Sequence, residues 1–198
     1  MKLLIATKNK AKIKKYSTIL NELGIDWITI NELNKDINVE ENGNTPNENA
    51  IIKAKAYYKA FNMPVLADDS GLILDKLSED KQPGVYVRRY KGKELTDEEI
   101  IELYSNEIDK VGGETTGGFL IAIAIIKENG EVFSNEIMHK RLFVSKPCIE
   151  RTPGYPMNSL IYDKDTEKYL AQNYEGKAMY KGNSFGKDFE FIKSVLID

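Results

Sequence analysis

The sequence predicts an α/β fold, organised as a single domain of two lobes over residues 1–198. In the first half, apolar runs typical of buried strands alternate with stretches whose apolar residues recur at helical spacing. From residue 115 onward, β-branched and apolar residues dominate, and this predicts long antiparallel strands that form a second lobe. We find no internal repeat and no low-complexity linker, so we expect the two lobes to share one domain.

Composition and charge exclude several classes of protein. The chain has 41% hydrophobic and 30% charged residues, which is typical of a soluble globular protein. Its formal net charge of -3 argues against a general nucleic-acid binder. No apolar run approaches the roughly 20 residues of a membrane span, and Met1–Ala6 is too short for a signal-peptide core. The single cysteine, Cys148, cannot form an internal disulfide, so we expect a reducing, cytoplasmic location.

The first strand and helix form a strand, a polar turn and a helix in that order. Leu3–Ala6 is a continuous apolar run that predicts a buried strand. Apolar residues at helical spacing follow over residues 13–23, and Gly24 ends the predicted helix.

The start of that helix is a candidate phosphate site. Backbone N–H groups at a helix start attract anions, and Thr7 and Asn9 add neutral donors. Three lysines add positive charge: Lys8, Lys10 and Lys12. A phosphate chain fits this arrangement, and a capped helix with a solvated lysine face is the alternative.

A second strand and helix follow. Trp27–Ile30 predicts the strand. Thr45 or Asn47 can cap the helix, whose apolar residues continue to about Phe61.

The polar segment 34–47 ahead of this helix predicts an acidic loop that contains Glu41. This loop can reach a metal held by Asp69, and a mobile charged loop without such a role is the alternative. On the helix that follows, Asn49 and Lys53 are four residues apart and therefore share a face.

Two adjacent carboxylates, Asp68 and Asp69, follow the apolar run Pro64–Leu66, which predicts a short buried strand that ends near them. Ser70 and Gly71 come next and are typical turn formers. At such a turn one carboxylate can point into a cleft while the next turns away. Because Mg²⁺ prefers carboxylate oxygens and commonly joins them to substrate phosphates, the turn predicts a magnesium site. An acidic turn with a purely structural role is the alternative.

The middle of the chain contains a further strand, a turn and a helix. Leu72–Leu74 predicts a strand and Gln82–Val85 a turn. Arg88 or Arg89 can pair with a phosphate through two hydrogen bonds. Thr96–Glu99 forms a capping box that opens a helix.

The predicted second lobe is dominated by strands. The run 115–126 is followed by an Asn129–Gly130 hairpin signal and by further strand-like segments up to residue 144. Gly154–Met157 predicts a turn, and apolar residues at helical spacing after Phe185 predict a terminal helix.

Three separated motifs together resemble the inosine triphosphate pyrophosphatase family, also called the Ham1 family. The first is Thr7-x-Asn9-x-x-Lys12, and the second is Glu41 followed by Glu48-Asn49-Ala50-x-x-Lys53-Ala54. The third is Asp68-Asp69-Ser70-Gly71-Leu72, followed by Pro83-Gly84-Val85-Tyr86 and Arg89-Tyr90. Each motif is weak alone, but their order along residues 1–90 is specific, and a looser strand pattern extends to about residue 145.

This resemblance implies an α/β fold of two lobes around a long mixed sheet, with a nucleotide cleft between the lobes. It implies Mg²⁺-dependent hydrolysis of noncanonical purine nucleoside triphosphates, such as ITP, dITP or XTP, to the monophosphate and pyrophosphate. The implied role is cleansing of the nucleotide pool by a cytoplasmic homodimer that binds no nucleic acid stably and no membrane.

The resemblance also assigns roles by position. Glu41 and Asp69 would bind the metal, Asp69 would orient or deprotonate the attacking water, and Lys53 would act as a phosphate or active-site partner. Asp68 is expected to act less directly than Asp69. The residues expected to bind the substrate in this half are Thr7, Asn9, Lys10, Lys12, Ser70 and Arg89.

The last third departs from the family pattern of Phe-Gly-Tyr/Trp-Asp-Pro and Ser-His-Arg. Pro153–Pro156 lacks both the first aromatic residue and the Asp, although Tyr155 can still stack on a base. Lys177 keeps the position of the family lysine, whereas the His-Arg pair is absent and Asn183 offers amide contacts instead. A pyrophosphatase for a different nucleotide and a non-catalytic nucleotide-binding module are therefore the alternatives. Retention of Glu41, Lys53 and Asp69 together favours an enzyme.

Overall fold

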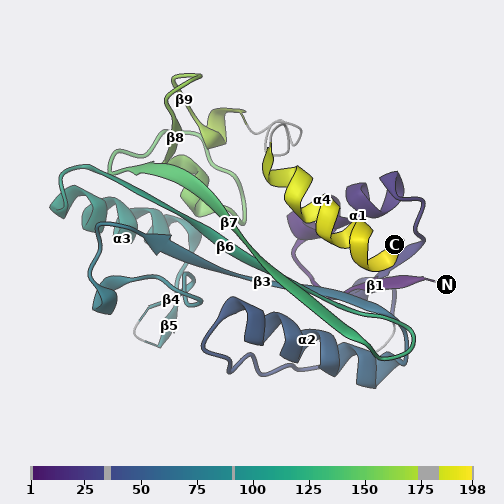
Figure 1. The fold of residues 1–198 in the computed structure, drawn as a ribbon. Coiled ribbons are helices and arrows are strands. Elements are labelled where there is room, and N and C mark those ends of the chain that lie inside the picture. Colours follow the sequence, from purple (N-terminus) through teal and green to yellow (C-terminus); the bar gives the residue numbers. More distant parts are fainter. Residues whose placement is uncertain (1, 34–36, 91, 174–182, 198) are drawn as a thin grey trace. The chain divides into compact units, whose positions relative to one another are not determined.

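The computed structural model describes residues 2–33, 37–90, 92–173 and 183–197 of the chain (Figure 1). The helices in this part are α1 (Lys10–Glu22), α2 (Pro46–Phe61), α3 (Asp97–Lys110) and α4 (Asn183–Leu196). The larger sheet contains the strands β1 (Leu3–Ile5), β2 (Trp27–Thr29), β3 (Val65–Leu74), β6 (Glu114–Ile126), β7 (Val132–Val144), β8 (Ile161–Asp163) and β9 (Lys168–Tyr169). A separate antiparallel pair consists of β4 (Arg89–Tyr90) and β5 (Lys93–Glu94). None of these helices has the length and apolar character needed to cross a membrane.

The predicted α/β class with a mixed sheet is confirmed. Strands of the larger sheet follow the order β2-β1-β3-β6-β7-β8-β9. β1 is parallel to both β2 and β3, whereas β8 is antiparallel to β7 and β9. The chain forms two compact units, and β3, β6 and β7 each contribute residues to both. The cleft expected between two lobes stays a prediction.

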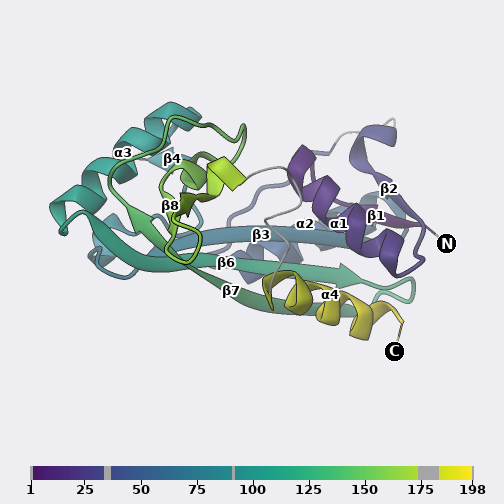
Figure 2. The same cartoon turned by 90° about the horizontal axis from the view of Figure 1, so that it is seen from above.

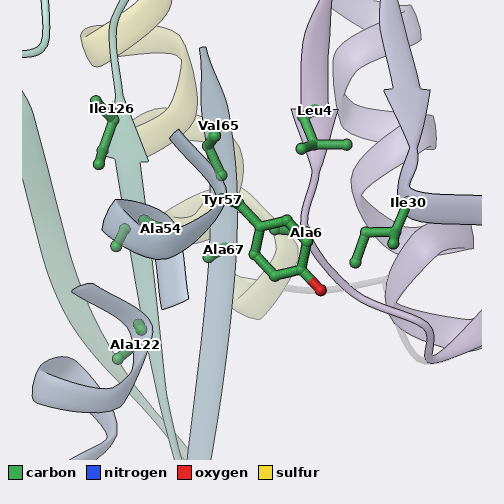
Figure 3. Packing of buried hydrophobic residues seen from close by; sticks show 11 residues of the cluster. Leu4, Ala6, Ile30, Ala54, Tyr57, Val65, Ala67, Ala122 and Ile126 are labelled. Atoms are coloured by element: carbon green, nitrogen blue, oxygen red, sulfur yellow. The ribbon is translucent and has the colours of Figure 1, made fainter. Parts of the chain in front are cut away.

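The first unit comprises Met1–Ser70, Ile121–Ile137 and Gly186–Asp198. Within it, α2 covers one face of the sheet, and α1 and α4 lie on the other face (Figures 1 and 2). The residues that α2 adds to the buried apolar cluster of this unit are small or aromatic, and the Tyr57 ring lies beside Ala6, which follows β1 (Figure 3). Besides Tyr57 and Ala6, this buried apolar cluster contains Leu4, Ile30, Ala50, Ala54, Val65, Ala67, Ala122, Ala124 and Ile126.

Helix α2 begins and ends where the sequence predicts. The Thr45 side chain accepts a hydrogen bond from the Glu48 backbone N–H at 3.1 Å, and Pro46 occupies the first helical position. The helix ends at Phe61, and Asn62 adopts the left-handed conformation with φ 50. This cap and this end fix the register of the α2 residues that face β3.

The predicted turn after a short strand at Pro64–Leu66 is wrong. β3 continues without interruption from Val65 to Leu74, so Asp68 and Asp69 lie inside a strand. Successive side chains of a strand point to opposite faces, and here Asp68 is buried whereas Asp69 is half-buried. The two carboxylates are therefore separated by the pleat of the strand rather than by a turn.

The second unit comprises Gly71–Leu120 and Met138–Phe185. Its core joins the apolar face of α3 to strand residues and to the short 3-10 helix Pro156–Ser159. The predicted capping box at Thr96–Glu99 is confirmed, because Thr96 and Glu99 exchange side-chain and backbone hydrogen bonds. The members of this cluster include Leu72, Leu74, Ile100, Ile101, Tyr104, Ile108, Phe143, Met157, Leu160 and Ile161.

Candidate functional site

A cluster of charged side chains lies in the first unit, just past the carboxyl end of β1 and along the middle of β3. β1 pairs with β3 through Leu4 and Val65, and through Ile5 and Leu66. β1 then ends, whereas β3 continues, so Asp68 and the residues after it extend beyond the last paired residue of β1. Carboxyl ends of parallel strands are where open α/β sheets bind ligands.

The predicted start of α1 is held by the polar residues between β1 and the helix. Asn9 is the N-cap, and its side-chain oxygen accepts hydrogen bonds from Ala11 N at 2.9 Å and Lys12 N at 3.3 Å. Thr7 Oγ1 accepts a hydrogen bond from Asn9 N at 3.2 Å. The Asn9 oxygen thus satisfies two N–H groups of the helix end, and the Asn9 amide and the Thr7 hydroxyl can donate to an anion.

Lys12 reaches from α1 to β3. Its Nζ lies 2.9 Å from Asp68 Oδ2, and Asp68 is only 3% exposed. Burial is the largest single effect and lowers the pKa of Lys12. The charge and hydrogen bond of Asp68, together with the charges of Asp69 and Glu41, outweigh it, so the pKa of Lys12 is raised. Lys12 therefore carries a positive charge next to three carboxylates.

Lys53 connects the acidic loop to β3. Its Nζ lies 3.1 Å from Glu41 Oε1 and donates a hydrogen bond to the backbone oxygen of Asp68 at 3.0 Å. The loop residue Glu41 is thereby held against the strand that carries Asp69. This arrangement brings Glu41 and Lys53 together, as the sequence motif suggests, although the role of each stays a prediction.

Asp69 is bound by Asn49 of α2, which donates from Nδ2 to Asp69 Oδ2 at 3.0 Å. Burial raises the pKa of Asp69 above its ordinary value, and the negative charge of Glu41 adds to this. Lys53, Lys12 and the Asn49 hydrogen bond lower the pKa but do not reverse the shift. A raised pKa makes the Asp69 carboxylate more basic than that of an ordinary Asp, which suits a general base.

The carboxylates fit a magnesium ion that takes further ligands from a substrate. Glu41 and Asp69 come from separate segments, and they lie close enough for the charge of Glu41 to affect the ionisation of Asp69. Among the described residues there is no cluster of three or more His, Cys, Asp or Glu side chains that could hold a metal. Two carboxylates plus phosphates and water are a usual Mg²⁺ environment, and Asp69 and Glu41 would hold the ion.

The other residues predicted to bind substrate take no part in the contacts described above. Lys10 is exposed and Ser70 is half-buried, both in the first unit. Tyr155 and Arg89 belong to the second unit, and Arg89 is the first residue of β4. α4 begins at Asn183. Lys177 lies outside the described residues.

Arg88 has protein partners that the sequence pattern did not indicate. Its guanidinium donates to Asp97 Oδ1 and to the backbone oxygen of Gly154, each at 2.9 Å. Asp97 Oδ2 in turn accepts a hydrogen bond from Gly154 N at 2.9 Å. These contacts fix the loop next to Tyr155, and the pairing of Arg88 with a phosphate stays a prediction.

Sequence reasoning missed two features of the site, the contact of Asn49 with Asp69 and the pairing of Asp68 with Lys12. The i, i+4 spacing of Asn49 and Lys53 was a usable signal, since it places both on one face of α2. The second pairing joins residues far apart in the sequence and leaves no local pattern.

Comparisons with known proteins agree with the family that the sequence motifs indicate. The model of the Ham1 family matches residues 3–173. The dITP/XTP pyrophosphatase of Halalkalibacterium halodurans is 34% identical over 170 residues, which cover 85% of this chain and 86% of that protein. The dITP/XTP pyrophosphatase of Bacillus subtilis is 34% identical over 186 residues, covering 93% of each chain. The structure of the Staphylococcus aureus Ham1 protein has a TM-score of 0.78 at 27% identity and covers 98% of this chain and 100% of its own.

Proposed function

We propose that this chain, which belongs to the Ham1 family, hydrolyses noncanonical purine nucleoside triphosphates such as dITP and XTP to the monophosphate and pyrophosphate. The relatives that cover most of the chain carry the name dITP/XTP pyrophosphatase. The observation that carries the proposal is the contact network that joins the family motifs: Lys12 with Asp68, Lys53 with Glu41, and Asn49 with Asp69.

The chemistry of this reaction matches the charges present. Attack of water on the α-phosphorus requires positive charge near crowded phosphate oxygens and a group that accepts the proton of the water. Lys12 and Lys53 provide positive charge, and Asp69 is the proposed proton acceptor because its raised pKa makes its carboxylate more basic than an ordinary Asp. The network needs no nucleophilic side chain.

We further propose that the reaction depends on Mg²⁺ and that Glu41 and Asp69 hold the ion. When bound, Mg²⁺ would neutralise phosphate charge and lower the pKa of a bound water. The substrate would lie against the helix start at Thr7 and Asn9, whose side chains offer neutral donors, with Lys12 close by.

A panel of nucleoside triphosphates tests the proposed function. The protein is incubated with Mg²⁺ and each of dITP, XTP, ITP, the standard purine nucleotides and the pyrimidine nucleotides, and pyrophosphate and orthophosphate are measured separately. We expect pyrophosphate as the first product, with dITP and XTP preferred. Preference for another base would assign a different nucleotide, and absence of release from every nucleotide would favour a non-catalytic binding module.

We also propose that the protein is a cytoplasmic homodimer. The family resemblance supports the dimer, and the single cysteine fits a reducing compartment. Light scattering of the purified protein tests the dimer, and a monomeric mass would contradict it.

A further inference from the structure

Asn49 is a buried polar side chain, 3% exposed, with two different hydrogen-bond partners. Its Oδ1 accepts a hydrogen bond from Gly43 N at 2.7 Å, and its Nδ2 donates to Asp69 Oδ2 at 3.0 Å. One amide thus joins the acidic loop to the strand carboxylate. Both ends of the amide are used, so its orientation is determined by the two partners.

The loop approaches Asn49 too closely for a side chain at position 43. A Cβ added to Gly43 would lie 2.6 Å from Glu48 Cβ and 2.8 Å from Asn49 Oδ1. These separations are shorter than van der Waals contact, and Glu48 Cβ cannot move without moving α2. Glycine at this position is therefore what allows the loop backbone to reach the Asn49 oxygen.

Asn49 and Lys53 are neighbours on α2, one helical turn apart. Lys53 binds Glu41 and the backbone of Asp68, and Asn49 binds Gly43 and the carboxylate of Asp69. The two side chains therefore form parallel connections between the same loop and the same strand. Only the Asn49 connection contacts the Asp69 carboxylate itself.

We propose that Asn49 is a positioning residue that sets the orientation of the Asp69 carboxylate relative to the loop that carries Glu41. Its Nδ2 donates to Oδ2 of Asp69, so this hydrogen bond turns that oxygen toward α2 and fixes the rotation of the carboxylate. The expected effect on turnover rests on the proposed function. The two hydrogen bonds of Asn49 do not depend on it.

Substitution of Asn49 by Asp distinguishes the hydrogen bond to Gly43 from the hydrogen bond to Asp69. Asn49→Asp keeps an oxygen that accepts from Gly43 N, but it replaces the donor to Asp69 with an oxygen that repels it. Asn49→Ala removes both contacts. Two readouts are followed: hydrogen exchange of the Gly43 amide by NMR, which needs no activity, and kcat and KM for dITP.

The matched control is Glu48→Gln. Glu48 Oε2 accepts a hydrogen bond from Asn44 N at 2.6 Å, so this residue ties the same loop to the same helix without contacting Asp69. The Gln variant keeps an acceptor oxygen. We expect it to retain kcat and protection of the Gly43 amide.

We expect Asn49→Asp to keep protection of the Gly43 amide and to lower kcat by about tenfold or more with a smaller change in KM. Asn49→Ala should lose the amide protection as well. If Asn49→Asp retains the wild-type kcat, or if Asn49→Ala leaves Gly43 exchange unchanged, the proposal is wrong. If the wild-type protein releases no pyrophosphate, the proposed function fails. The hydrogen bonds of Asn49 are then still tested by exchange: faster exchange of the Gly43 amide in Asn49→Ala would support them, and unchanged exchange would refute them.

Discussion

Lys12 and Asp68 form a largely buried ion pair, with Lys12 Nζ 2.9 Å from Asp68 Oδ2. Asp68 Oδ1 has no hydrogen-bond partner among the described residues, so Lys12 is the neighbour that compensates the buried side chain. The lysine expected to bind phosphate is thus also part of the structure that holds α1 against β3. A substrate phosphate near Lys12 would share this cation with Asp68.

The Lys12–Asp68 pair predicts unequal costs for its two single variants. Lys12→Met leaves a buried carboxylate without a cation, and we expect the free energy of unfolding to fall by about 3 kcal/mol. Asp68→Asn should cost less, because Asp69 and Glu41 still act on Lys12. Urea denaturation measures both. The control is Lys10→Met at an exposed position, which should stay within about 0.5 kcal/mol of wild type, and an equal effect of both lysine variants would contradict the assignment.

Asp69 predicts a pH-dependent difference in stability between the wild type and Asp69→Asn. Burial raises the pKa of this carboxyl in the folded state, so ionising it costs the folded state more than the unfolded chain. At pH 7 we therefore expect the neutral Asn variant to unfold at higher denaturant concentration than the wild type. This advantage should shrink as the pH falls and Asp69 becomes protonated. An advantage that stays constant with pH would indicate that the variant acts through packing instead.

The Asp97 contacts predict an effect on nucleotide affinity. Asp97 holds Gly154 directly and through Arg88, and Gly154 precedes Tyr155, the residue expected to stack on the base. We expect Asp97→Ala to raise KM severalfold and to change kcat little. Tyr155→Ala is the companion variant and should act in the same direction. Unchanged KM in both variants would remove Tyr155 from the base site.

Two glycines predict opposite changes in stability. A Cβ at Gly117 would lie 2.2 Å from the backbone oxygen of Ile73, so we expect Gly117→Ala to lower the free energy of unfolding by about 2 kcal/mol or more. Gly186 lies in α4 with no atom within 4 Å of an added Cβ, and Gly186→Ala should stabilise by up to about 1 kcal/mol. Thermal unfolding compares them. A neutral result at Gly117 would mean that the strands can separate at low cost.

Local sequence signals predicted most of the elements. Thr45 with Pro46 and the apolar spacing up to Phe61 predicted α2, and the Asn129–Gly130 pair predicted the turn between β6 and β7, where Gly130 has φ 85. These features depend on neighbouring residues, such as a cap, a fixed proline φ or a glycine in a left-handed conformation. Such causes are visible in the sequence because they act over a few positions.

The errors arose where long-range contacts decide the structure. Asp68, Asp69, Ser70 and Gly71 have the composition of a turn, yet they form part of a strand because neighbouring strands and the lysines of α1 and α2 stabilise polar residues there. The protein partners of Arg88, which are Asp97 and the Gly154 backbone, were likewise not evident from local sequence. The family motifs identified the candidate site residues, but only the coordinates showed which of them contact one another.

The comparison of nucleotide binding and turnover in Asp69→Asn tests the central claim most directly. The variant keeps an oxygen that can accept from Asn49 but loses the charge that would hold Mg²⁺ and accept a proton from water. With dITP, we predict that pyrophosphate release is abolished while calorimetry shows that nucleotide binding largely persists. Pyrophosphate release at the wild-type rate would contradict the role of Asp69 in the proposed reaction.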